Sequence, residues 1–272
     1  MRWARVIASV ATLGVLVWRL GTGPFVDGLH TVDGGALAAG AGLAVLTTVC
    51  CAWRWRTVAR GFGTELPLGA AVAAYYRSLF LNVTLPGGVA GDVHRGVTLG
   101  VRAVVWERAA GQIVQLVLTV AVLLALPSPV RGAMPYITAA LVVVAAGAAL
   151  AARGRRLPTV RWPAVVLASA VIVAGHVVTF LIAARTAGVT APLSDLVPLA
   201  LLVLAGASLP NVGGWGPREG VTAWAFGAAG LGASVGVATA VVYGVIVIVA
   251  TLPGAAVLVA PWIRVPEEVL DA

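Results

Sequence analysis

The stretch that decides the fold reads LPGGVAGDVHR and runs from Leu85 to Arg95. It follows an apolar run and holds three glycines and a proline, which loosen the backbone or remove an N–H donor, so no helix continues through it. Broken backbone at membrane depth is stable only where protein or a water-filled cavity surrounds it. A second stretch, LPNVGGWGPRE from Leu209 to Glu219, repeats the pattern. We therefore expect the other helices to hold these two breaks opposite each other.

The composition is that of a membrane protein. Of the 272 residues, 60% are hydrophobic and 10% are charged, whereas about a quarter of the residues in soluble domains are charged. The apolar runs are continuous, as at 139–152 and 235–260, and do not alternate as barrel strands do. The sequence therefore predicts an all-α integral membrane protein.

Charge and motifs narrow the functional classes. The net charge of +8 comes from 18 arginines, which sit at helix ends and not on one solvated face, so we expect an anionic lipid as partner and no nucleic acid.

The adjacent Cys50 and Cys51 indicate neither a disulfide framework nor a metal site. No Walker A, zinc-protease or esterase motif occurs, so we expect no enzyme and no cofactor. Asp92 and His94 could serve a lipid phosphatase or transferase, but no obvious nucleophile stands beside them.

We expect six spanning helices and two re-entrant helical hairpins, about eight membrane segments in all. The expected spans are residues 6–20, 36–53, 109–126, 136–152, 164–184 and 235–260. The hairpin arms are residues 66–85 with 93–108, and 196–209 with 221–231. Counting each hairpin arm as a span gives eight to ten helices instead.

The arginines favour the re-entrant version, because cytoplasmic loops carry an excess of basic residues. If residues 66–85 crossed fully, the basic loop at 153–161 would lie outside. If they return to the cytoplasmic side, only three arginines lie outside, namely Arg19, Arg131 and Arg185. Both termini are then cytoplasmic, in the inner (cell) membrane. The halves 1–130 and 131–272 of this single domain become inverted repeats, and transporters with such repeats bind substrate where broken helices meet.

The polar residues of the two breaks are the candidates for binding substrate. The set is Arg77, Asn82, Pro86, Gly87, Gly88, Gly91, Asp92, His94, Arg95, Pro210, Gly213, Gly214, Gly216, Arg218 and Glu219. Guanidinium groups suit a lipid phosphate through bidentate hydrogen bonds, and glycine-rich backbone can cradle it. We expect Arg77, Arg95 and Arg218 to meet in one wet pocket.

Structural interpretations of the same residues stay open. Arg77 could pair with Asp92, or Asp92 could cap the helix that follows it. His94 could be an interface residue or couple to protons. Arg218 and Glu219 could pair with each other or across the breaks. Glu107 could favour the dipole of a helix that starts there, and Gln112 and Gln115 could bond between helices.

The chain resembles the lysylphosphatidylglycerol synthase transmembrane-region, or flippase-like, family. The first signature is similar to LNVTLPGG at 81–88 followed by Gly91, Asp92 and Arg95, and Glu107-Arg108 matches a helix start of the family. The second signature is similar to Leu209-Pro210, Gly213-Gly214, Gly216 and Arg218-Glu219.

The resemblance implies a bacterial or archaeal inner-membrane protein that moves an anionic phospholipid or polyprenyl-phosphate-linked lipid between leaflets. Members that make lysyl-phosphatidylglycerol carry a large soluble C-terminal transferase domain. Because this chain ends at Ala272, just after a membrane helix, we expect no aminoacyl-transferase activity. The alternative is a non-transporting accessory subunit that partners a cell-envelope lipid or glycan synthase.

Overall fold

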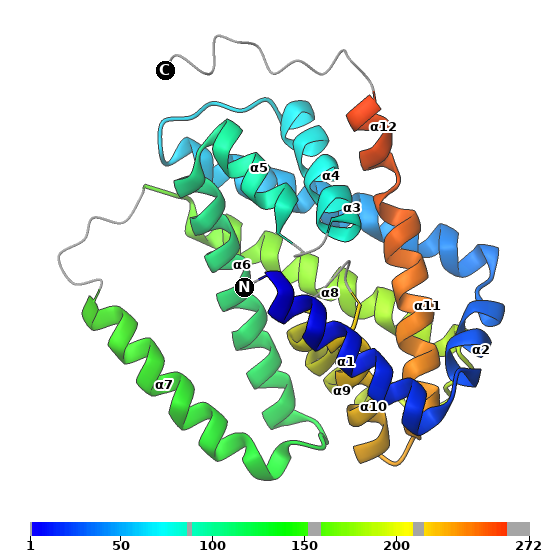
Figure 1. Cartoon of the computed structure of the whole chain (residues 1–272). Coiled ribbons are helices and arrows are strands. Elements are labelled where there is room, and N and C mark those ends of the chain that lie inside the picture. The colour runs from blue at the N-terminus through cyan, green and yellow to red at the C-terminus, as the bar shows by residue number, and fades with distance from the viewer. Residues whose placement is uncertain (1, 86–88, 152–158, 209–214, 260–272) are drawn as a thin grey trace.

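A computed structural model describes residues 2–85, 89–151, 159–208 and 215–259, in which the regular structure is helical. Figure 1 shows the helices in chain order. They are α1 (Arg2–Leu20), α2 (Gly23–Thr31), α3 (Gly34–Arg60), α4 (Leu68–Thr84), α5 (Ala90–Leu99), α6 (Val101–Ala125), the 3-10 helix η1 (Arg131–Ala133), α7 (Met134–Ala151), α8 (Trp162–Thr186), α9 (Leu193–Ala207), α10 (Pro217–Ala228), α11 (Ala233–Thr251) and α12 (Pro253–Val259).

Within the described residues, four helical segments are long and apolar enough to cross a membrane. They are α3, α6, α8 and the pair α11–α12, which together cover Ala233–Val259. A fifth would be α1 with α2, where Ser9–Leu20 and Gly23–Thr31 are bent by 97°. The apolar segments Arg131–Gly147 and Leu193–Ala207 are shorter. The chain is thus a helical integral membrane protein, while the count of six spans and the inverted repeat stay predictions.

The helix pair α4–α5, on either side of the first break, starts and ends at one end of the helix bundle, which we call the Arg60 end. There the end of α3 meets the start of α8, because Gly61 packs against Val160. The start of α6 lies beside them, with the Arg102 guanidinium 5.3 Å from the centre of the Phe62 ring. Since α4 and α5 connect α3 to α6, this helix pair begins and ends at the Arg60 end.

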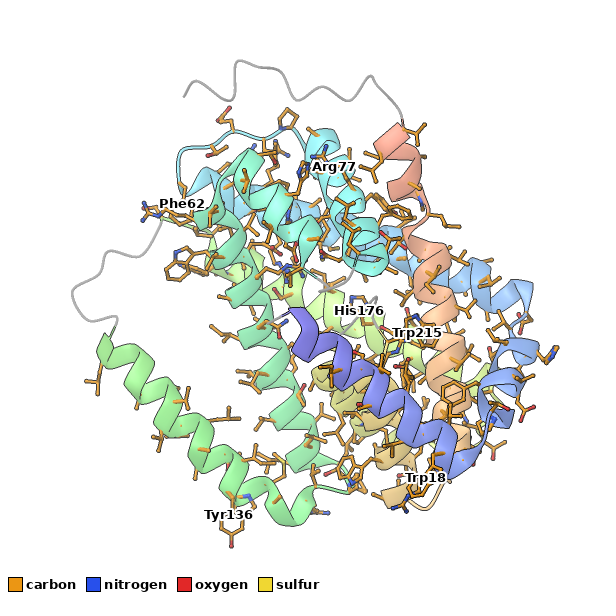
Figure 2. All side chains as sticks on the ribbon, viewed as in Figure 1. Trp18, Phe62, Arg77, Tyr136, His176 and Trp215 are labelled. Carbon is orange, nitrogen blue, oxygen red and sulfur yellow. The ribbon has the colours of Figure 1, made fainter. Side chains whose placement is uncertain are left out.

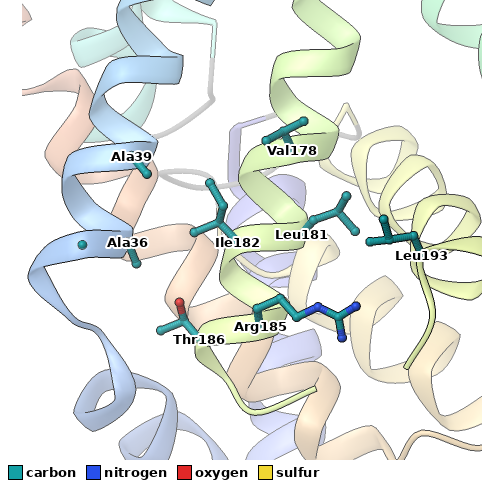
Figure 3. A pocket seen from close by; sticks show the side chains of 9 residues that line it. Ala36, Ala39, Val178, Leu181, Ile182, Arg185, Thr186 and Leu193 are labelled. Carbon is teal, nitrogen blue, oxygen red and sulfur yellow. The ribbon is translucent and has the colours of Figure 1, made fainter. Parts of the chain in front are cut away.

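The helix pair α9–α10, on either side of the second break, starts and ends at the opposite end of the bundle, which we call the Gly34 end. One hollow there is lined by the starts of α3 and α9 and the end of α8, including Ala36, Arg185 and Leu193 (Figure 3). A second hollow joins the loop after α6 to the start of α9 and the end of α10, through Pro127, Asp195 and Ala228. The pair α9–α10 therefore starts and returns at the Gly34 end. In Figure 1, α4 and α5 lie toward the top, and α9 and α10 toward the bottom.

Glycine allows the two helices of each pair to approach closely. A Cβ on Gly91 would lie 2.1 Å from the carbonyl oxygen of Ser78, so α5 rests directly on the backbone of α4. A Cβ on Gly206 would lie 2.7 Å from a methyl group of Val221, which brings α9 against α10. Each pair is thus a packed hairpin and not two independent helices.

The structure corrects the expected start of the third span. Residues 93–108 do not form one amphipathic arm, because Gly100 interrupts them with a φ of 105°, a conformation that favours glycine. The segment divides into α5 and the first turns of α6, which begins at Val101 and not at residue 109. As a result Glu107 lies in the second turn of a long helix.

A buried apolar core joins the second hairpin to the spans around it. Phe180 of α8 contacts Phe226 of α10 and Tyr243 of α11, with ring centres 6.2 and 6.0 Å apart. These rings pack with apolar residues of α9, such as Leu199 and Val203. Packing of this kind fixes α10, and with it the charged residues at its start.

Candidate functional site

Five charged side chains from three helices form a largely buried ion-pair network. We call it the first cluster, and its members are Arg54 of α3, Asp92 and Arg95 of α5, and Glu107 and Arg108 of α6. Three positive and two negative groups leave a net charge of +1 when all are ionised. Buried ion pairs seldom repay their desolvation, so such a network in a membrane protein is a candidate for function.

Glu107 is the centre of the first cluster. It is fully buried, and its Oε1 accepts hydrogen bonds from Arg54 Nε at 3.0 Å and from the Tyr75 hydroxyl at 3.3 Å. Arg54 Nη2 also donates to Oε1, and Arg95 Nη2 donates to Oε2 at 3.3 Å. Glu107 therefore does not serve the start of a helix dipole, as its expected place in a first turn had suggested.

Asp92 holds the first hairpin to α6. Its carboxylate accepts hydrogen bonds from Ser78 Oγ and Asn82 Nδ2 of α4, each at 3.1 Å, and from Arg95 Nη2 at 3.0 Å and Arg108 Nη2 at 2.6 Å. Burial raises the pKa of Asp92, but Arg108 and Arg95 more than offset this, so its pKa lies below the usual value. Asp92 pairs with neither Arg77 nor the free N–H groups of α5 among the described residues.

Asn82 makes the contact at the start of α5 that was expected of Asp92. Its Oδ1 accepts a hydrogen bond from the Gly91 N–H at 2.8 Å, while its Nδ2 donates to Asp92. One side chain thus ties the end of α4 to the first turn of α5. Because Gly91 is already in contact with Ser78, it has a packing role in this arrangement.

Arg95 is buried between two aromatic rings. Its guanidinium carbon lies 4.5 Å from the centre of the Trp55 ring and 4.2 Å from that of Tyr75, and only 1% of the residue is exposed. Its Nη2 bonds to both acids, but within the described residues its Nε and Nη1 are buried without a hydrogen-bond partner. Unpaired buried donors on a cation are where an anion would bind.

Arg54 is a member that the sequence analysis missed. It directly follows the expected span 36–53 and counted only as an arginine at a helix end, yet it is 5% exposed and its Nη1 donates to Ser169 Oγ of α8 at 2.9 Å. Gly111 of α6 makes room for it, because a Cβ there would lie 2.6 Å from Arg54 Nη1. The sequence signal available was a glycine on α6 one turn after Glu107.

A second cluster lies at the start of α10. Glu219 Oε1 accepts hydrogen bonds from Arg218 Nε at 2.9 Å and Nη2 at 2.5 Å, and its Oε2 accepts from the Gly216 N–H at 2.6 Å. The Arg218 guanidinium lies 5.2 Å from the ring of Trp215 and 5.5 Å from that of Tyr243. Mutual pairing of Arg218 and Glu219, one of the two expected arrangements, is the one observed.

The two clusters repeat one local design. In each, an arginine is flanked by a tryptophan and a tyrosine and bonds to a fully buried glutamate. In each, a glycine of a spanning helix makes room for a guanidinium, Gly111 for Arg54 and Gly244 for Arg218. The first cluster differs in its surplus arginine and its unpaired N–H groups.

That Arg77, Arg95 and Arg218 meet in one wet pocket stays a prediction, but the described part of the structure shows no direct bond between the parts that hold Arg95 and Arg218. Arg95 and Arg218 have separate acidic partners, and no ion pair or hydrogen bond joins the two clusters among the described residues. Figure 2 shows Arg77 far from Trp215, the ring beside Arg218. Arg95 finds its acids on α5 and α6, and Arg218 finds its acid beside it on α10.

Arg77 and His94 lie outside both clusters. Arg77 of α4 has a buried Nε without a hydrogen-bond partner in the described part of the chain. His94 is exposed on α5, and partial desolvation of its ring together with the charge of Arg77 lowers its pKa. The remaining candidates lie outside the described residues, and they are Pro86, Gly87, Gly88, Pro210, Gly213 and Gly214.

Comparison with known proteins identifies a family. The family described as lysylphosphatidylglycerol synthase TM region matches residues 2–162, which is more than half of the chain. The match includes the first break and the whole first cluster, while the second cluster lies beyond it. No curated protein and no solved structure matches the sequence.

Proposed function

Because the chain belongs to the lysylphosphatidylglycerol synthase TM region family, we propose that it is a lipid flippase or translocase. Its substrate is an anionic phospholipid or a polyprenyl-phosphate-linked lipid, which it moves between the leaflets of the cell membrane. The proposal includes no aminoacyl-transferase activity, and we assign a catalytic role to none of the residues.

The observation that supports this proposal most is the surplus positive charge of the first cluster. A phosphodiester headgroup carries one negative charge, which matches the net +1 of the five ionised side chains. The unpaired Nε and Nη1 of Arg95 supply two donors of a planar guanidinium, the geometry that suits two phosphate oxygens. Asp92 and Glu107 position the arginines, and Arg77 would meet the phosphate nearer the Arg60 end.

The arrangement of the helix ends supports a re-entrant, inverted topology. The hairpin α4–α5 belongs to the Arg60 end and α9–α10 to the Gly34 end, as two copies of opposite orientation require. We propose that the Arg60 end lies in the cytoplasm, because most of the described arginines lie there, and that both termini are cytoplasmic. Those at the Gly34 end are Arg19, Arg131 and Arg185.

The test is lipid exchange in proteoliposomes that contain fluorescent phosphatidylglycerol, with a quencher that reaches only the outer leaflet. The wild-type protein should expose the inner-leaflet lipid to the quencher, and Arg95→Gln should slow this at least tenfold. Arg102→Gln is the matched control, because Arg102 lies at the same end over Phe62, outside the first cluster. Exchange by wild type no faster than in protein-free liposomes would refute the proposal.

The accessory-subunit alternative is favoured by α7. This helix stands apart from the bundle in Figure 1 and exposes a run of valines, with Val142, Val143 and Val144 each about two-thirds exposed or more. An apolar helix that stands apart is available to another membrane protein. Stable co-purification with an envelope synthase, together with no lipid exchange, would favour this second function.

A further inference from the structure

A stripe of polar residues runs along α6 away from the first cluster. Arg108, Gln112, Gln115 and Thr119 follow one another at intervals of four, three and four residues, so they share one face of the helix. The residues between and after them are almost all apolar. Polar side chains on one face of a spanning helix normally face protein or a polar substrate and not lipid tails.

This stripe faces a hollow and not a neighbouring helix. Gln112, Gln115 and Thr119 line a cavity of about 300 Å³ between α6 and α9, opposite Ala205 and Ser208. The two glutamines were expected to bond between helices, yet in the described part of the chain no hydrogen bond joins either amide to another helix. Thr119 is buried and donates only to the Gln115 carbonyl oxygen of its own helix. The two amides are therefore free to bind a ligand.

The stripe connects the two broken segments. At one end Arg108 bonds to Asp92 of the first cluster, and at the other Ser208 directly precedes the second break. The 12 residues from Arg108 to Thr119 span roughly 16 Å of helix, about half of a hydrocarbon core of about 30 Å. A polar group on the stripe would thus move from the Arg60 end to mid-membrane without leaving α6.

The apolar face beside the stripe selects the kind of ligand. Ile113 and Val117 are each 61% exposed and Leu116 is 44% exposed, and in a bilayer these side chains contact acyl chains. Ile113 and Leu116 also line the hollow with the glutamines. A ligand with a polar head and apolar tails satisfies both faces, whereas a water-soluble solute would satisfy only one.

We propose that the polar stripe of α6 is the track along which the lipid headgroup crosses the half of the membrane next to the Arg60 end, with its tails left in the bilayer. This inference rests on the proposed function and adds the path to it. The headgroup leaves the arginines of the first cluster, exchanges hydrogen bonds with the amides of Gln112 and Gln115, and arrives beside Ser208. Non-covalent contacts suffice for every step.

The first experiment locates the headgroup and needs no transport. In a Cys50→Ala, Cys51→Ala background, a fluorescent label is attached to Gln115→Cys or, as matched control, to Val117→Cys. The proteins are placed in phosphatidylglycerol vesicles that contain a quencher on either the headgroup or the acyl chain. The headgroup quencher should act at least threefold more strongly on position 115 than on position 117, and the acyl-chain quencher should do the reverse. Equal headgroup quenching at the two positions would overturn the inference.

The second experiment tests whether the track is used. Gln112→Leu, Gln115→Leu should slow lipid exchange at least tenfold without reducing the anionic lipid that remains bound to purified protein. Leu124→Ile, on α6 beyond the stripe, is the control and should exchange lipid normally. Unchanged exchange in the double variant would overturn the inference. If wild type exchanges no lipid but headgroup quenching at position 115 persists, the proposed function fails while the headgroup site stands.

Discussion

Glu107 is the residue on which the first cluster depends most. Donors from three helices meet at its carboxylate, namely Arg54, Tyr75 and Arg95, and the residue is fully buried. Removing one partner of a buried ion pair leaves uncompensated charge. We therefore expect Glu107→Ala to lower the free energy of unfolding by about 3–5 kcal/mol.

Thermal melting in detergent measures this loss. Glu65→Ala is the control, because Glu65 is an exposed acid just before α4, and its melting temperature should match that of wild type. If Glu107→Ala melted like Glu65→Ala, the carboxylate would not hold the cluster together.

Gly111 gives a second prediction at the residue scale. A Cβ at this position would meet Arg54 Nη1 at 2.6 Å and push the guanidinium away from Glu107 and Ser169. Overpacking of a filled site costs about 1–3 kcal/mol, so Gly111→Ala should be destabilising by that amount. Gly42→Ala on α3 meets nothing within 4 Å and should raise stability by up to about 1 kcal/mol. Equal melting temperatures for the two variants would contradict the packing described.

Among the elements, the first hairpin depends on the contact between α4 and α5. Gly91 lies against the Ser78 backbone, and backbone cannot move aside as a flexible side chain can. Gly91→Ala should therefore separate the helices, weaken the bonds from Ser78 and Asn82 to Asp92, and reduce the yield of folded protein severalfold. Gly69→Ala, on α4 with open space around it, should give the wild-type yield. Size-exclusion chromatography of the purified variants compares them, and a normal yield of Gly91→Ala would exclude the tight contact.

Local sequence patterns predicted the elements better than their boundaries. Long apolar runs predicted α3, α8 and the pair α11–α12 within a few residues, except that α3 continues to Arg60. The start of α6 was missed, because residues 101–108 carry helix-forming and charged side chains that suit either an amphipathic arm or the first turns of a span. Only the positive φ of Gly100 divides them, and a glycine in a sequence does not reveal its φ.

At the scale of the whole molecule, the proposed topology requires each broken segment to return to the side of the membrane from which it started. Single cysteines introduced without Cys50 and Cys51 test this, at Thr64 and Val101 around the first hairpin, and at Ser194 and Ala229 around the second. A membrane-impermeant thiol reagent should label both members of a pair from the same side, and the two pairs from opposite sides. Labelling of Thr64→Cys and Val101→Cys from opposite sides would show that the first segment crosses fully.

Contacts of the site between residues close in sequence could be predicted, whereas contacts between residues far apart in sequence could not. Arg218 with Glu219, and Asp92 with Arg95, are close in sequence, so their pairing follows from local geometry. Arg54 and Glu107 are 53 residues apart, and only the packing of α3 against α6 brings them together. The sequence also could not show that Arg95 and Arg218 would each find their own acid.

The central claim is that Arg95 binds the phosphate of an anionic lipid, and native mass spectrometry tests it most directly. Protein is purified from an equimolar mixture of phosphatidylglycerol and phosphatidylcholine, and the lipid that stays bound is identified. We expect one phosphatidylglycerol to be retained by wild type and by Arg102→Gln, and to be lost from folded Arg95→Gln. Equal retention of phosphatidylglycerol by Arg95→Gln and wild type, or its absence from wild type, would contradict the claim.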